Sequence, residues 1–182
     1  MIFIETDLKG SYIIEPKKEE DDRGFFARTL EKKKFLELGL DIELFQSNIS
    51  FNKQKGTIRG MHYQKAPYEE VKLVRCTQGK IFDVIIDLRS YSTTYKDWFG
   101  IELSSDNYKM IYIPKGFAHG FQTLEDNTEV FYQMSDCYMP EAARGVLWDD
   151  KDIGIKWPLT PTKISKKDLN YDPLRLEDIE KK

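Results

Sequence analysis

Short runs of β-branched and aromatic residues make up most of this chain. Examples are KLVRCTQGKIFDVIIDL, WFGIELS, YKMIYIPKGFAHGF and TEVFYQMSDCYM, and clusters of Gly, Asp, Asn or Pro separate them. Closely spaced strands of this kind are typical of all-β sandwiches and barrels. No period of roughly 20 to 50 residues recurs, which argues against a repeat array. The pattern therefore predicts a single all-β domain.

The stretch from 80 to 88, KIFDVIIDL, alternates most clearly. Its even positions from Phe82 to Leu88 are all apolar, whereas Asp83 and Asp87 share the other face. This alternation predicts a strand with one buried face and one face that is at least partly in water. The polar face could line a cavity.

Two short segments have helical features. Residues 31–39, EKKKFLELG, place apolar side chains among charges and end on Gly39, which predicts a short surface helix with a glycine stop. Near the end of the chain, Ser165 precedes Asp168 at N-cap spacing, so Asp168 could lie in the first turn of a terminal helix. The predicted fold is therefore an all-β barrel with short peripheral helices.

Composition favours one compact domain over residues 1–182, with a core over about 12–168 and a C-terminal tail over 169–182. The chain is 40% hydrophobic and 13% aromatic, which is enough for a sizeable core. The end of the tail, RLEDIEKK, is acidic and lysine-rich and is expected to be solvated.

Charge and hydropathy argue against two classes of partner. The net charge of −3 comes from 28 basic and 31 acidic residues mixed along the chain, so we expect no broad basic surface for nucleic acid. The N-terminal MIFIETDLKG carries acidic residues where a signal peptide is basic and then apolar, and no apolar run reaches spanning length. We expect a cytoplasmic protein with no membrane partner.

Cysteine and histidine are scarce. Cys76 and Cys137 cannot build a disulfide framework and lack zinc-ribbon spacing, so both are predicted to be core thiols. The two histidines are His62, in IRGMHYQ, and His119, in IPKGFAHGF. About half of such strand histidines are simply packing residues, and that alternative stays open for both.

The histidine segments are similar to the two half-motifs of a cupin barrel. Metal cupins hold their ion with several histidines and a carboxylate, often including H-x-H. Here the corresponding tripeptide is His62-Tyr63-Gln64, so no metal centre is predicted. Arg59 and His62 have opposite strand parity, and both can face one cavity only if Gly60 permits a bulge or twist.

A series of ordered blocks carries a wider resemblance, and its members are DDRGFFAR, QSNIS, GTIRGMHYQ, KLVRCTQGKIFDVIIDLR, IPKGFAHGF, TEVFYQMSDCYMP, GVLWDD, IKWP and ISKKD. From about Tyr12 to Asp168 the chain resembles the dTDP-4-dehydrorhamnose 3,5-epimerase family, the RmlC-like cupins. The resemblance implies a cupin-type jelly-roll barrel. It also implies a homodimer that epimerises a nucleotide-linked 4-keto-6-deoxyhexose without metal or organic cofactor.

The resemblance also implies catalytic roles. A 4-keto group acidifies the hydrogens at C3 and C5, so the reaction needs a base, an acid on the opposite face and positive charge beside the enolate. His62 would be the base, Asp168 its orienting partner and Tyr132 the proton donor, with Lys72 supplying the positive charge. Each has an ordinary structural alternative, since Tyr132 shares the parity of core positions and Lys72 could be a solvated strand lysine.

The family pattern further implies substrate contacts from many positions. Arg23, Arg59 and Lys167 would contact the phosphates or nearby groups, and His119 would stand beside the 4-oxygen. Part of the site near RGFF would come from the neighbouring subunit. The remaining expected contacts are Gln46 and Asn48 as polar groups, and Phe26 and Tyr138 as rings that pack on the base or sugar.

Two positions depart from the family pattern. Arg28 and Ala143 stand where many dTDP-sugar epimerases have Glu, so CDP or GDP could replace dTDP; alternatively, Arg28 faces water and selects nothing. The sequence leaves open whether one or both carbons are epimerised. It also leaves two other functions open, a nucleotide-sugar 3,4-ketoisomerase and a non-catalytic sugar-binding jelly roll.

Overall fold

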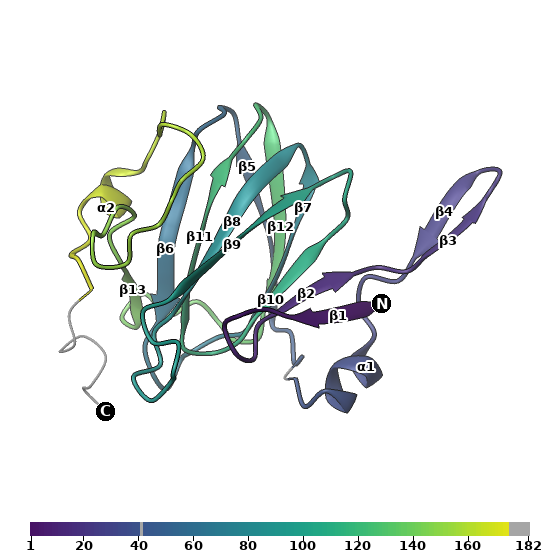
Figure 1. The fold of residues 1–182 in the computed structure, drawn as a ribbon, viewed down its shortest axis with the longest axis horizontal. Helices are drawn as coiled ribbons and strands as arrows, with labels where there is room; N and C mark the ends of the chain where they lie inside the picture. The colour runs from purple at the N-terminus through teal and green to yellow at the C-terminus, as the bar shows by residue number, and fades with distance from the viewer. Residues whose placement is uncertain (41, 175–182) are drawn as a thin grey trace.

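The computed structural model describes residues 1–40 and 42–174, and two antiparallel sheets that face each other dominate it (Figure 1). The six-stranded sheet has the order β1 (Ile2–Glu5), β2 (Tyr12–Glu15), β10 (Met110–Ile113), β7 (Lys72–Gln78), β12 (Thr128–Met134), β5 (Gln46–Asn52). The five-stranded sheet has the order β13 (Ala143–Gly145), β6 (Ile58–Gln64), β11 (Phe117–Thr123), β8 (Lys80–Asp87), β9 (Trp98–Ser104). The predicted all-β architecture is confirmed.

The main core lies between the two sheets. Val74 and Ile111 from the six-stranded sheet pack with Ile81 and Ile85 from the five-stranded sheet, and all are buried. Burial of such side chains contributes roughly 1.5 to 3 kcal/mol each, so this layer holds the barrel closed.

The prediction that one face of residues 80–88 is at least partly wet is wrong. Asp83 and Asp87 are both fully buried. Asp83 faces the barrel interior and pairs with His119, whereas Asp87 is bound by Arg89 and by the Thr94 hydroxyl. The alternation was misleading because both carboxylates have buried partners, which lets a charged group lie inside the protein.

The opposite face of β8 is covered by the C-terminal part of the chain. Val84 and Ile86 pack in a second cluster that includes Ile153 and Leu174. The Leu174 amide donates to Asp150 Oδ2 at 2.7 Å. Ordered packing therefore reaches beyond residue 168, where the core was expected to end, and the RLEDIEKK stretch at 175–182 lies outside the described residues.

Both predicted helices are present and short. Helix α1 (Lys32–Glu37) buries Phe35 in a cluster that includes Ile14 and Tyr112, and Gly39 follows with φ +70°. Helix α2 (Lys166–Leu169) begins after Ser165, whose side chain accepts from the Asp168 amide. Among the described residues, neither helix is long or apolar enough to cross a membrane.

The cysteines differ from each other. Cys76 is buried, and burial raises the pKa of its thiol to about 11. Cys137 is exposed, so the prediction of a core thiol is wrong there. It lies in the connection after β12, where the chain has left the sheet.

A long hairpin projects from the body of the barrel (Figure 1). Its strands, β3 (Lys18–Asp21) and β4 (Gly24–Ala27), pair with each other as a separate two-stranded sheet. The Arg23 side chain at its turn pairs with Asp21, and Phe26 is 67% exposed. Two of the expected substrate contacts thus lie on a projecting arm.

Strand β6 contains the bulge that the sequence required. His62 pairs with His119, but Arg59 pairs with Phe121, so β6 uses one more residue than β11 over this interval. Gly60 lies inside the bulge with φ +126°, and its backbone lies against Gly120. A Cβ at position 60 would meet the Gly120 Cα at 2.6 Å.

Replacing Gly60 by Ala should lower the free energy of unfolding for two reasons: Ala is strained at this positive φ, and its Cβ would overlap Gly120. Gly24→Ala is the matched control, because Gly24 has φ +129° but nothing within 4 Å of its would-be Cβ. Both variants carry a backbone cost of about 1–3 kcal/mol, and Gly60→Ala adds steric overlap of about 1–3 kcal/mol. Chemical denaturation would measure the two free energies of unfolding. Equal losses would contradict the close-approach argument.

Candidate active site

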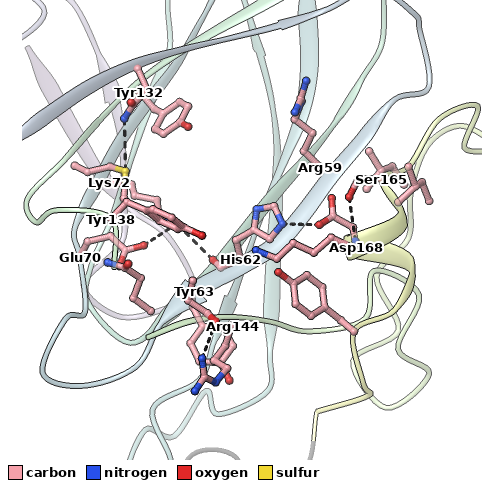
Figure 2. Close-up of a pocket in the computed structure, with 18 of the residues that line it drawn as sticks. Arg59, His62, Tyr63, Glu70, Lys72, Tyr132, Tyr138, Arg144, Ser165 and Asp168 are labelled. Carbon is pink, nitrogen blue, oxygen red and sulfur yellow. Dashed lines mark hydrogen bonds and ion pairs between the residues drawn. The ribbon is translucent and has the colours of Figure 1, made fainter. Parts of the chain in front are cut away.

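A cavity of about 720 Å³ opens between the two sheets and the C-terminal segment (Figure 2). Strand β6 of one sheet and strands β5, β7 and β12 of the other contribute side chains to its walls. The expected site residues that line it are Gln46, Asn48, Arg59, His62, Lys72, Tyr132, Tyr138, Lys167 and Asp168.

A histidine–aspartate pair lies in one wall. His62 Nε2 is 2.7 Å from Asp168 Oδ1, and the Gly60 amide donates to the other carboxylate oxygen at 3.4 Å. The Ser165 hydroxyl accepts from the Asp168 amide at 3.0 Å, so Asp168 occupies the first turn of α2 and also pairs with His62. The His62 side chain is 44% exposed and that of Asp168 5%, so the ring faces the cavity and its carboxylate partner is shielded.

Asp168 keeps its charge despite burial. Desolvation raises its pKa, but hydrogen bonds from His62, from the Gly60 amide and with Ser165 outweigh it, so the pKa is lower than usual. A fixed carboxylate at this distance orients the imidazole and stabilises the positive charge that forms when the ring accepts a proton. The pair is therefore built for a general base.

Tyr132 faces the cavity from the opposite sheet. It lies on β12 and packs against the central core, as its parity with Val130 suggested. Burial raises the pKa of its phenol, while the positive charge of Arg59 acts in the opposite direction. The phenol therefore stays protonated at neutral pH and can donate a proton.

Lys72 lies on the cavity floor in an ion pair that the sequence did not reveal. Its ammonium is 3.1 Å from Glu70 Oε1 and donates to the His62 carbonyl oxygen at 3.4 Å. The Lys72 and Glu70 side chains are only 9% and 4% exposed. The alternative of a solvated strand lysine is wrong, because Glu70, two residues earlier, supplies a counter-charge inside the protein.

His119 is not among the side chains that line the cavity. It is 8% exposed, and its Nε2 lies 2.8 Å from Asp83 Oδ2 inside the barrel. Burial raises the pKa of Asp83, and the charges of His119 and Lys72 partly oppose this rise. Within the protomer His119 is thus held by Asp83 and does not line the cavity.

Cationic side chains surround the cavity. Arg59 is held by Asn52, whose Oδ1 accepts from its Nε at 2.6 Å, and Lys167 lies on α2. Lys163 and Arg144 also line the cavity, although the sequence did not single them out as binding residues. Their positions depend on the irregular C-terminal segment and on a three-residue edge strand, which leave no periodic signal in the sequence.

The three expected contacts from the N-terminal part of the chain, two on the projecting hairpin and one just after it, lie elsewhere within one protomer. Phe26 and Arg28 line a separate hollow of about 320 Å³, and Arg28 lies 3.5 Å from Glu31. The Arg23 side chain is 85% exposed. Of the two positions that depart from the family pattern, Ala143 lines the main cavity and Arg28 does not.

No group of three or more His, Cys, Asp or Glu side chains within residues 1–40 and 42–174 is arranged to hold a metal ion.

The fold is a jelly roll of the cupin type, and its cavity brings groups capable of acid–base chemistry together with cationic side chains that could bind an anionic substrate. The family model for dTDP-4-dehydrorhamnose 3,5-epimerase matches residues 5–175. The chain belongs to this family, whose reaction makes it an isomerase.

Individual relatives agree over nearly the whole chain. A dTDP-4-dehydrorhamnose 3,5-epimerase from Methanothermobacter thermautotrophicus is 46% identical over 95% of this chain and 94% of its own length. The Bacillus anthracis enzyme crystallised with TDP and PPi superposes with a TM-score of 0.91 at 43% identity, covering 95% of this chain and 99% of the other. The Legionella pneumophila enzyme in complex with dTDP-4-keto-L-rhamnose has a TM-score of 0.90 at 38% identity, covering 97% and 94%.

These similarities confirm the cupin-type jelly roll and the assignment to nucleotide-sugar 3,5-epimerisation. They do not favour the ketoisomerase or the non-catalytic sugar-binding module, because the matching proteins are named epimerases.

Asp168→Asn should lower stability at neutral pH and much less in acid. The folded-state pKa of Asp168 is depressed, so its stabilising contribution is present above the ordinary pKa of 3.8 and is lost as pH falls through the folded-state value. We expect a loss of about 1–3 kcal/mol at pH 7. Denaturant titrations at several pH values would measure it, with the exposed Asp106→Asn as control. If Asp168→Asn lowers the free energy of unfolding by the same amount at neutral and at acid pH, the stabilisation does not come from the ionised Asp168 carboxylate.

Proposed function

We propose that this protein epimerises both C3 and C5 of a nucleotide-linked 4-keto-6-deoxyhexose, with His62 as base and Tyr132 as acid. The supporting observation is the placement of these two groups. His62, backed by the shielded Asp168, lies on one wall, and the protonated Tyr132 lies on the opposite sheet. A sugar bound between them would present one face to each group. Inversion requires removal of a proton from one face and its return to the other.

The proton steps follow from the hydrogen bonds. His62 Nε2 is occupied by Asp168, so Nδ1 is the nitrogen that accepts the C5 proton. The electrons of the C–H bond move to the 4-oxygen as an enolate, which the Lys72 ammonium stabilises. Tyr132 then donates its proton to the opposite face of C5 and the ketone re-forms. His62 and Tyr132 return to their starting states through solvent, and the same cycle at C3 gives the second inversion.

The diphosphate would bind among the cavity's cations. Arg59 and Lys167 are the proposed contacts, with Lys163 and Arg144 beside them, because guanidinium and ammonium groups suit phosphate oxygens. Gln46, Asn48 and Tyr138 complete the polar and aromatic lining. The relatives crystallised with TDP and with dTDP-4-keto-L-rhamnose support a dTDP sugar as the donor.

We propose a homodimer in which the arm of one subunit completes the site of the other. Within one protomer Arg23 and Phe26 are exposed and lie away from the cavity. The outer face of β5 and the residue before it also expose Phe45, Ile49 and Phe51, by 65%, 64% and 46%. An exposed apolar face of this kind is suited to a second copy of the chain, and the projecting hairpin could reach that copy.

We also propose a cytoplasmic location and a role in supplying a deoxysugar nucleotide, in the manner of dTDP-rhamnose biosynthesis, for a surface polysaccharide such as O antigen. Membership of the family supports both proposals.

The central test is proton exchange in heavy water with the dTDP, CDP and GDP forms of 4-keto-6-deoxyglucose, followed by NMR. We expect loss of both the C3 and the C5 proton signals with the dTDP sugar. His62→Ala and Tyr132→Phe should each slow turnover by about 10² to 10⁴-fold, the usual contribution of a positioned acid or base. Tyr91→Phe, in a residue that is 85% exposed, is the control. Near-normal turnover by the His62 variant would refute the assignment.

A mixing experiment tests the shared site. Arg23→Ala and His62→Ala homodimers should each be inactive. After subunit exchange, random pairing makes about half of the dimers mixed, and each mixed dimer has one intact site, so about one quarter of wild-type activity should return. Light scattering would verify the dimer. Recovery of no activity from a mixture shown to have exchanged would mean that Arg23 serves the cavity of its own chain or has another role.

A further inference from the structure

Tyr171 lines the cavity, yet the mechanism above does not use it. It lies just after α2, in the segment that leads to the buried Leu174. The sequence placed it in the C-terminal tail, so nothing singled it out. It lies beside His62, the proposed base, and beside Lys167, a proposed phosphate ligand.

The Tyr171 ring lies directly over Gly145, on the edge strand next to β6. A Cβ at position 145 would meet the ring carbons at 2.2 to 2.5 Å. Gly145 itself pairs with His62 across the β13–β6 ladder. The absence of a side chain at 145 therefore creates the space in which the ring lies beside His62.

The two ends of the Tyr171 side chain contact different groups. Its ring meets the His62 imidazole edge to face, with the ring centres 5.9 Å apart and an interplanar angle of 71°. The Lys167 ammonium lies 6.0 Å from the centroid of the Tyr171 ring, and its interaction with Tyr171 raises the pKa of Lys167. Burial raises the pKa of the phenol in spite of the Lys167 charge, so the hydroxyl stays neutral.

We propose that Tyr171 is a positioning residue that fixes His62 through its ring and Lys167 through its hydroxyl. This inference rests on the proposed roles of His62 as base and Lys167 as phosphate ligand. The ring closes one side of the imidazole, whose other constraint is the bond to Asp168. The hydroxyl holds a long, flexible ammonium side chain at the cavity wall, which reduces the freedom that Lys167 loses when the diphosphate binds.

The two contacts predict two different kinetic effects. Tyr171→Phe keeps the ring and removes the hydroxyl, so KM for the nucleotide sugar should rise about five- to tenfold while kcat changes less than about twofold. Tyr171→Leu removes the ring as well, so kcat should fall by at least about tenfold, because a small displacement of a catalytic group is costly. Exchange rates by NMR at varied substrate concentration give both constants.

Gly145→Ala tests the same contact without altering Tyr171. The added methyl group must displace the ring, so kcat should fall as it does in Tyr171→Leu. In the Tyr171→Leu background, Gly145→Ala should have little further effect, within about twofold, because the ring is already gone. Thermal unfolding of every variant checks that the fold is retained.

The controls separate this inference from the function on which it rests. His62→Ala must slow turnover by about 10² to 10⁴-fold in the same assay, and Tyr91→Leu must leave it unchanged. If the His62 variant is slowed in this way while both Tyr171 variants match the wild type, only the positioning role fails. Full additivity of Gly145→Ala and Tyr171→Leu also overturns it. If the His62 variant remains active, the proposed function itself fails.

Discussion

The close approach of the backbones at Gly60 and Gly120 is the constraint on which the rest of the site depends. It allows the bulge in β6, and the bulge turns both Arg59 and His62 toward one cavity although their positions in the strand have opposite parity. The same bulge directs the Gly60 amide at Asp168. A backbone feature without any side chain thus sets the direction of the base and also binds the carboxylate that supports it.

Two sheets and a terminal segment then share the work of holding the reacting groups. The proposed base, His62, comes from one sheet and the proposed acid, Tyr132, from the other, so the core between the sheets fixes their separation. The base's carboxylate partner comes from α2, which is tied to the barrel by the packing of the residues beyond it. Groups carried by rigid elements lose little freedom when substrate binds, which is what acid–base catalysis on opposite faces requires.

Much of this arrangement could be predicted from the sequence, and the rest could not for definite reasons. Strand alternation gave the all-β class, and the need for a bulge at Gly60 followed from parity alone. The burial of Asp83 was not predicted, because the periodicity of a strand shows only which positions are polar. It does not show that a partner such as His119 lies inside the barrel. Tyr171 was missed because it follows the last family block, where neither spacing nor a strand pattern indicates a contact.

Holding the positive charge of Lys72 inside the cavity has an energetic cost, because charged groups lose their hydration when they are buried. Lys72 is almost fully buried beside Glu70, and the charge on Asp83 is close enough to interact with it. One oxygen of each carboxylate, Glu70 Oε2 and Asp83 Oδ1, is buried without a hydrogen-bond partner among the residues that the structure describes. Ion pairs in such places contribute little net stability, because desolvation offsets most of the attraction. Their use here is therefore better explained by chemistry. The Lys72 ammonium, held by Glu70 and the His62 carbonyl oxygen, is already in place when negative charge develops on a bound sugar, so no reorganisation is needed at that moment.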